Sequence, residues 1–149
     1  RQLLLILTHD IIMGILVAVS DDGQFKTVLN VAVRLASGLD EGLYITHITE
    51  TESASGDERD FRDEIRESLP ETTVSIDSGL EHLSRSGLRS GTAIGKQLVE
   101  LSESADIDHI VIGHRSKGRL TTAREGHTGF VVADEATVPV TIVPEAGNS

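Results

Sequence analysis

Short apolar runs alternate along the chain with longer segments in which apolar residues recur every three or four positions. Residues 15–19 form a continuous apolar run, which is typical of a strand that is covered on both faces. In the next segment, Phe25 and the later apolar residues fall on one face of a helix. We expect Asp22 to cap this helix and Gly38 to end it.

The alternation continues to the end of the chain and predicts further strands and helices. Three glycines interrupt residues 78–91, so this segment accommodates either a short helix or the true third strand within 81–88. The other expected elements are strands at 43–48, 72–76, 109–112 and 138–143, and helices that end at Pro70, begin at Thr92 and span 128–136.

The order of these elements indicates the fold class. Connections long enough for crossover helices favour an α/β protein, with a mostly parallel sheet and helices on both faces. In open sheets of this class, ligands bind beyond the carboxyl ends of the strands, where the strand order reverses. The segments expected at that edge are 20–23, 47–50 and 113–128.

Composition and charge exclude several classes of protein. The 149 residues carry 24 Asp and Glu against 13 Lys and Arg, and this net charge of -11 argues against a general nucleic-acid-binding surface. The lack of cysteine excludes disulfides and cysteine-built zinc sites. No apolar stretch is long enough to cross a membrane. We therefore expect a cytoplasmic protein with one domain, residues 13–149, and with neither a nucleic-acid nor a membrane partner.

The first twelve residues fit this pattern poorly. Residues 1–12 contain the apolar run 3–7 but lack the small-residue cleavage site of a secretory signal. Met13, the only methionine, stands just before the first predicted strand. One interpretation is that residues 1–12 arise from an upstream start assignment or an artificial extension. The alternative is a native arm that adds a strand or covers a sheet edge.

The main functional signal is the segment 113–128, which joins a buried strand to a helix. Glycine lets backbone N–H groups approach an anion, and a helix N-terminus offers free N–H donors with a partial positive charge. These features favour phosphate binding, whereas the alternative is a surface loop whose glycines only make turns. In a chain otherwise poor in positive charge, the loop carries four basic residues: Arg115, Lys117, Arg119 and Arg124.

The chain resembles the universal stress protein (UspA-like) family over residues 13–144. The resemblance implies an adenine-nucleotide alpha hydrolase-like, Rossmann-like sheet of five strands in the order 3-2-1-4-5, and a homodimer formed through strand 138–143. It also implies a stress-response module in which nucleotide occupancy is linked to dimer or partner signalling. The matching segments are Gly14-Ile-Leu-Val-Ala-Val19, Ile45-Thr-His47-Ile48, Asp108-His-Ile-Val-Ile-Gly113 and Ala136-Thr-Val-Pro139-Val140-Thr-Ile-Val143-Pro144.

Many members of the family bind ATP in a loop of the form Gly-x2-Gly-x9-Gly-Ser/Thr. Gly113 matches the first glycine and Gly126 the third. Two positions depart from the pattern, since Ser116 replaces the second glycine and His127 the Ser/Thr. Thr128 offers a hydroxyl one place later.

The resemblance also implies a role for each residue of the site. Ser20 stands where the family carries an Asp at the end of the first strand, so that Ser20 or the adjacent Asp21 contacts the adenine or ribose. Mg²⁺ comes with the nucleotide, because it favours phosphate oxygens and water. The backbone of Val19, Ile48 and Ile112 flanks the base, while Gly113, Arg115, Gly126, His127 and Thr128 hold the phosphates and Lys117 lies near the terminal phosphate.

The same fold allows two alternatives to an ATP-binding module. A member that binds no nucleotide would act through protein contacts alone, and a weak ATPase is a further alternative. No residue is placed as a general base, so no catalytic residue is assigned. No histidine pair has metal-ligand spacing, so no metal site is assigned, and His47 and His109 are expected to be hydrogen-bonded structural residues.

A receiver-like phosphoacceptor domain is an alternative from a different functional class. Asp21, Asp22 and Asp77 follow predicted strands, as the acidic residues of such a site do. Such a site also needs a Lys after the last strand, and no Lys occurs after Lys117.

The charge composition generates a first prediction about stability. The basic residues are ten Arg and only three Lys, and an acidic excess with scarce Lys is typical of a protein adapted to concentrated salt. Salt screens the repulsion among surface carboxylates, since the Debye length falls to about 3 Å at 1 M. We expect the melting temperature to rise with KCl over the molar range. A melting temperature that stays flat or falls would contradict this interpretation.

Overall fold

A computed structural model describes residues 14–20, 24–49, 56–82, 90–104, 106–113 and 128–144. All neighbouring strands are parallel, and their order is β3-β2-β1-β4-β5, so the predicted fold class and strand order are confirmed. The described elements are β1 (Gly14–Ala18), α2 (Phe25–Leu39), β2 (Leu43–Thr49), α3 (Gly56–Ser68), β3 (Ile76–His82), α4 (Ser90–Ser104), β4 (Ile107–Gly113), α6 (Thr128–Glu135) and β5 (Val140–Val143).

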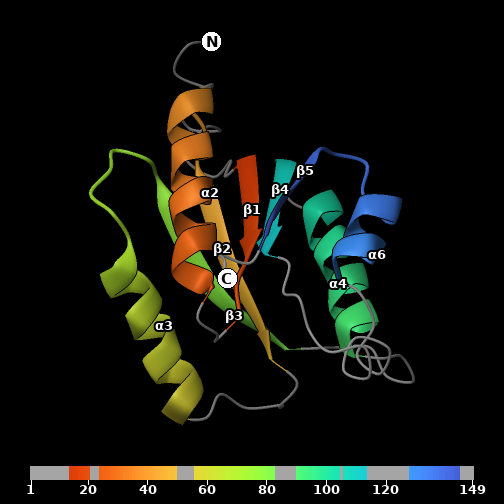
Figure 1. Ribbon diagram of the computed structural model, residues 1–149, viewed down its shortest axis with the longest axis horizontal. Coiled ribbons are helices and arrows are strands. Elements are labelled where there is room, and N and C mark those ends of the chain that lie inside the picture. The colour runs from red at the N-terminus through yellow and green to blue at the C-terminus, as the bar shows by residue number, and fades with distance from the viewer. Residues whose placement is uncertain are drawn as a thin grey trace.

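The helices cover the two faces of the sheet in pairs, α2 with α3 and α4 with α6 (Figure 1). In β1, the side chains of Ile15 and Val17 pack beneath α2 and α3, whereas Leu16 packs beneath α4 and α6. Successive strand residues point to opposite faces, so a strand covered on both needs an unbroken apolar run. None of the three side chains is more than 1% exposed, which confirms the interpretation of residues 15–19.

The predicted end of α2 at Gly38 is wrong. Gly38 lies within the helix, which continues to Leu39 and ends at Asp40 in the left-handed conformation (φ 56°, ψ 50°). Aspartate tolerates this conformation better than most residues, so no glycine is needed there. At the other end the N-cap position belongs to Gln24, while Asp22 lies outside the described residues.

The predicted third strand over 72–76 is also wrong, because β3 begins only where that segment ends. The Thr72 hydroxyl accepts a hydrogen bond from the backbone N–H of Val74 (3.1 Å), and such a local bond competes with strand pairing. Within β3, a Cβ on Gly79 would lie 2.7 Å from the hydroxyl oxygen of Tyr44. Gly79 leaves room for the side chain of Tyr44, and a glycine at this position interrupts the apolar pattern by which a strand is predicted.

The segment 78–91, left open by the sequence, divides between two elements. Its first five residues complete β3 and its last two begin α4, whereas 83–89 lie outside the described residues. On α3, Phe61 and Ile65 are buried and face the sheet. β5 begins one residue after Pro139, which has no N–H to offer the sheet but whose carbonyl accepts the N–H of Ile110 (3.0 Å).

Two carboxyl groups meet at the amino edge of the sheet, beside Gly14. A Cβ on Gly14, which has a φ of +84°, would lie 3.0 Å from the Cβ of Glu41, so glycine leaves room for the Glu41 side chain. A hydrogen bond to Asp108, burial and the negative charge of Asp108 raise the pKa of Glu41 to about 7. Folding therefore favours the protonated form of Glu41.

This raised pKa predicts how stability changes with pH. Because the folded pKa lies above the ordinary value of 4.5, Glu41 contributes its full stability below pH 4.5 and loses it as the pH rises through about 7. Glu41→Gln removes the ionisable group, so we expect its free energy of unfolding to exceed that of the wild type by about 1–2 kcal/mol at pH 8, after allowance for solvent screening. The two proteins should differ little at pH 4.5, as measured by urea denaturation.

The matched control is Glu103→Gln, which removes the same charge from an exposed position on α4. We expect this variant to follow the pH dependence of the wild type. Parallel pH curves for Glu41→Gln and the wild type would contradict the raised pKa of Glu41.

Candidate functional site

The strand order reverses at β1, which lies between β2 and β4. From β1 the chain moves through α2 to one side of the sheet, and after β3 it returns through α4 to the other side (Figure 1). Connections that leave in opposite directions open a crevice beyond the carboxyl ends of the two central strands. In this chain those ends are Ala18 of β1 and Gly113 of β4.

The three residues predicted to flank a base all lie at this edge, but not on one face. Val19 directly follows β1, Ile112 pairs with Ala18 across β1 and β4, and Ile48 is the next-to-last residue of β2. Ile48 and Ile112 belong to the buried cluster beneath α4 and α6, whereas Val19 belongs to the cluster beneath α2 and α3. A ligand at this edge would meet Ile48 and Ile112 from one face, and Val19 only through its backbone.

The backbone of Val19 is held by two hydrogen bonds. Its N–H donates to the carbonyl of Thr46 (3.0 Å), and its carbonyl oxygen lies 3.0 Å from Nδ1 of His47. The ring of His47 also meets Phe61 of α3 edge to face, with ring centroids 4.8 Å apart. His47 is thus the hydrogen-bonded structural residue that was predicted. It fixes the point at which the chain leaves β1, one residue before the exposed Ser20.

Thr46 is a polar residue at this edge that the sequence analysis missed. Its side chain is completely buried, and within the described part of the chain its hydroxyl oxygen has no hydrogen-bond partner. It pairs with Ala18 of β1 and with Gly79 of β3. No sequence signal distinguishes Thr46 from an ordinary β-branched strand residue.

Gly113 is required by packing as well as by its place before the loop. A Cβ at this position would lie 2.9 Å from a methyl carbon of Val28 and 3.2 Å from the side-chain amide of Gln24, both of which come from the start of α2. Sequence reasoning assigned this glycine to the approach of an anion. The structure adds a second reason, since α2 leaves no room for a side chain.

Thr128 begins α6 and places the N-terminus of that helix beside the end of β4. A Cβ on Gly129 would lie 3.9 Å from the terminal methyl of Ile112. On the other side of α6, Gly95 of α4 lets the helices approach, because a Cβ there would meet the Thr128 carbonyl at 3.2 Å. The start of α6 thus lies near Ile112. The N–H groups at a helix N-terminus suit an anion.

The structure therefore brings part of the predicted site together. Six of the predicted residues lie in, or directly after, elements that end or begin at the carboxyl edge of the sheet: Val19, Ser20, Ile48, Ile112, Gly113 and Thr128. The other predicted residues lie outside the described residues, namely Asp21, Arg115, Lys117, Gly126 and His127.

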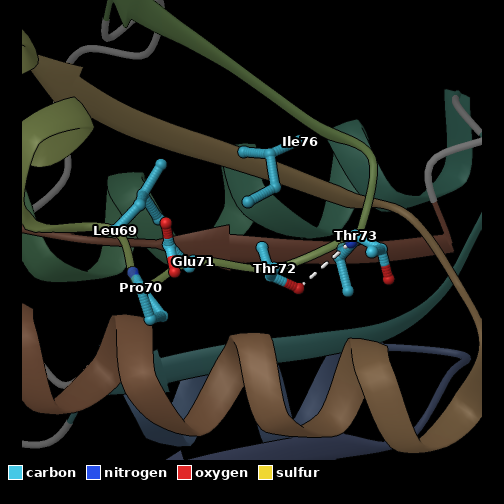
Figure 2. A pocket seen from close by; sticks show the side chains of 7 residues that line it. Leu69, Pro70, Glu71, Thr72, Thr73 and Ile76 are labelled. Atoms are coloured by element: carbon cyan, nitrogen blue, oxygen red, sulfur yellow. Dashed lines mark hydrogen bonds between the residues drawn. The ribbon is translucent and has the colours of Figure 1, made fainter.

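Figure 2 shows a separate open hollow in the connection between α3 and β3. It lies at the amino end of β3, at the opposite edge of the sheet from the strand ends described above. Among the described residues no basic side chain lines it, and a phosphate there would meet the carboxylate of Glu71. The hollow is therefore not the predicted anion site. Its lining residues are Leu69, Pro70, Glu71, Thr72, Thr73, Val74 and Ile76.

The receiver-like alternative is wrong because of the position of Asp77. This residue is the second of β3 and lies at the amino edge, whereas a phosphoacceptor site of that kind gathers its acids at the carboxyl ends. Its carboxylate accepts the backbone N–H of Ser78 (2.8 Å). Asp77 thus has a local structural contact and cannot join residues that follow β1.

The described ranges contain no group of three or more His, Asp or Glu side chains arranged to hold a metal ion. None of their helices has the length and apolar character needed to span a membrane. His109, predicted to be a structural residue, has its Nε2 2.7 Å from the hydroxyl of Thr141 and links β4 to β5.

Comparison with solved structures supports the fold. The chain is similar to a universal stress protein in complex with cAMP, with a TM-score of 0.65 and 16% identity over 89% of this chain and 97% of that chain. It is also similar to the universal stress protein from Archaeoglobus fulgidus in complex with dAMP (TM-score 0.59, 20% identity, 89% and 98% covered). A third similar structure is UspA from Lactobacillus plantarum (TM-score 0.62, 16% identity, 88% and 97% covered).

Comparison at the level of sequence gives the family. No curated protein matched the chain. The model of the universal stress protein family matches residues 13–144, the same range over which the sequence motifs resemble that family. Because this match covers most of the chain and agrees with the strand order, the chain belongs to the universal stress protein family.

Proposed function

We propose that this chain is a cytoplasmic, single-domain nucleotide-binding module of the stress response that takes ATP at the carboxyl ends of β1 and β4. The observation that carries the proposal is the meeting of Gly113, the N-terminus of α6 and the buried Ile48 and Ile112 at the point where the strand order reverses. Similar structures in complex with cAMP and dAMP support an adenine nucleotide as the ligand class.

In this proposal each part of the nucleotide meets a different part of the edge. Ile48 and Ile112 offer an apolar surface for the base, and Ser20 or Asp21 contacts the adenine or ribose. The phosphates meet the N–H groups of α6 and the basic loop that follows β4. The residues assigned to the phosphates are Gly113, Arg115, Lys117, Gly126, His127 and Thr128.

In this proposal a metal ion accompanies the nucleotide. Mg²⁺ favours phosphate oxygens and water over an all-protein cage, so the nucleotide would supply most of its ligands. A bound Mg²⁺ would offset part of the phosphate charge in this strongly acidic chain. In this proposal the site works as a binding module, because none of its residues is assigned a catalytic role.

We further propose that the chain forms a homodimer through residues 138–143. β5 is an edge strand, and an edge presents unpaired backbone groups to a partner. Ile142 on this strand is 41% exposed, and Phe130 in the first turn of the adjacent α6 is 70% exposed. Burying both side chains would stabilise a dimer without disturbing the carboxyl edge of the sheet.

The nucleotide proposal is tested by Gly126→Asp. A carboxylate next to the bound phosphates would repel them, so we expect the variant to lose Mg-ATP binding by at least about a hundredfold. Binding is measured by titration calorimetry in molar KCl. The nucleotide that copurifies with the wild type is identified by mass spectrometry of the denatured protein.

Gly38→Asp is the matched control, because a Cβ at Gly38 would have nothing within 4 Å. It adds the same side chain to α2 and should leave binding unchanged. Wild-type protein that copurifies without nucleotide and binds no added Mg-ATP would overturn the proposal. The function would then be that of a family member acting through protein contacts alone, with Ser116 and His127 as the cause.

The dimer proposal is tested by Ile142→Lys. In the proposed dimer, a lysine at position 142 would place an unpaired charge in the interface. We therefore expect the dimer dissociation constant, measured by sedimentation equilibrium, to rise at least about tenfold. Leu39→Lys is the control, because Leu39 is a comparably exposed apolar residue (52%) at the far end of α2. A monomeric wild type, or equal effects of both variants, would contradict the interface.

A further inference from the structure

The side chain of Gln24 joins three elements that are distant in the sequence. Gln24 precedes α2 and is only 7% exposed. Its amide nitrogen Nε2 donates a hydrogen bond of 2.8 Å to the carbonyl of Val143, the last residue of β5. The bond thus spans from the start of α2 to the carboxyl end of an edge strand.

The same amide group covers the end of β4. A Cβ on Gly113 would lie 3.2 Å from both Cδ and Oε1 of Gln24, so the amide occupies the space that a side chain there would need. Gly113 and Val143 form the last pair of the β4–β5 ladder. Gln24 donates a hydrogen bond to Val143 and fills the space in which a side chain on Gly113 would lie.

This contact matters because β5 is short and has one described neighbour. It contains four residues and pairs with β4 alone in the described sheet. The Gln24 bond is a further link, directed at the end of β5 that lies beside Gly113. A buried carbonyl that loses its donor is costly, so this link favours one position of β5 relative to Gly113.

We propose that Gln24 is a positioning residue that couples the nucleotide site at Gly113 to the edge strand β5. This inference rests on the proposed function and deepens it, because it names the path by which nucleotide and dimer affect each other. A nucleotide that fixes Gly113 favours the position in which Gln24 holds Val143, and therefore favours the dimer. By linkage, the dimer binds the nucleotide more tightly by the same factor.

The chemistry of residue 24 separates coupling from simple packing. In Gln24→Met the side chain keeps its length but has no N–H donor. In Gln24→Glu the ionised carboxylate faces the Val143 carbonyl without a proton, whereas the protonated acid donates a hydrogen bond again. Burial beside a carbonyl oxygen raises the pKa of such a carboxyl group, so the acid form should return at mildly acidic pH.

The first test measures the dimer dissociation constant by sedimentation, with and without saturating Mg-ATP, at pH 8 and at pH 5. We expect Mg-ATP to tighten the wild-type dimer about tenfold at both pH values. Gln24→Met should lose this effect at both. Gln24→Glu should lose it at pH 8 and regain it at pH 5. Wild-type coupling in both variants at both pH values would overturn the proposal.

The second test requires no nucleotide. We expect amide hydrogen exchange in residues 140–143 to be about tenfold faster in Gln24→Met than in the wild type, because the donor to Val143 is lost. Exchange in β2 and β3 should be unchanged. Gln97→Met removes a glutamine that is equally buried, 7% exposed, but lies on α4, and it should leave β5 exchange unchanged.

The two tests separate the possible failures. Unchanged β5 exchange in Gln24→Met overturns the link itself. The other possible failure is that β5 exchanges faster in Gln24→Met but the wild type binds no Mg-ATP. That result would support the link between Gln24 and β5, and it would reject both the nucleotide proposal and the coupling that rests on it.

Discussion

The burial of β1 between two helical layers is the constraint on which the rest of the structure depends. Ile15, Leu16 and Val17 are almost wholly removed from solvent, and each such side chain contributes about 1.5–3 kcal/mol relative to an exposed position. The backbone N–H and C=O groups of a fully buried strand need hydrogen-bond partners along both of its edges. In β1 the neighbouring strands β2 and β4 provide them. The reversal of strand order at β1, and with it the crevice at the carboxyl edge, follows from this central position.

The residues at that edge have structural roles besides the binding roles proposed for them. His47 holds the carbonyl of Val19, and the start of α2 closes over Gly113, so the ends of β1 and β4 are fixed without a ligand. A preorganised edge of this kind loses little conformational freedom when a ligand binds. The N-terminus of α6 lies beside the same edge because glycines at 95 and 129 allow close packing.

The two edges of the sheet have different chemistry. At the amino edge, the neighbouring Asp108 raises the pKa of Glu41, and Glu71 lies in the hollow between α3 and β3. At the carboxyl edge the chain presents a helix N-terminus and leads into the basic loop after Gly113. The proposed anion site therefore lies at the carboxyl edge, away from the carboxylates of the amino edge.

The sequence by itself determined the α/β class, the central strand and the inward faces of α2 and α3, because the period of apolar residues reports which side chains are buried. It failed at β3, where Gly79 makes room for the Tyr44 ring and the apolar alternation disappears. It also failed at the end of α2, where an aspartate adopts a conformation usually left to glycine. Only the tertiary structure decided that Gln24 bonds to Val143, that His47 holds Val19 and that the buried Thr46 hydroxyl has no hydrogen-bond partner among the described residues. Such contacts depend on strand order and register, which bring together residues as many as 119 positions apart, and no local pattern of residues records them.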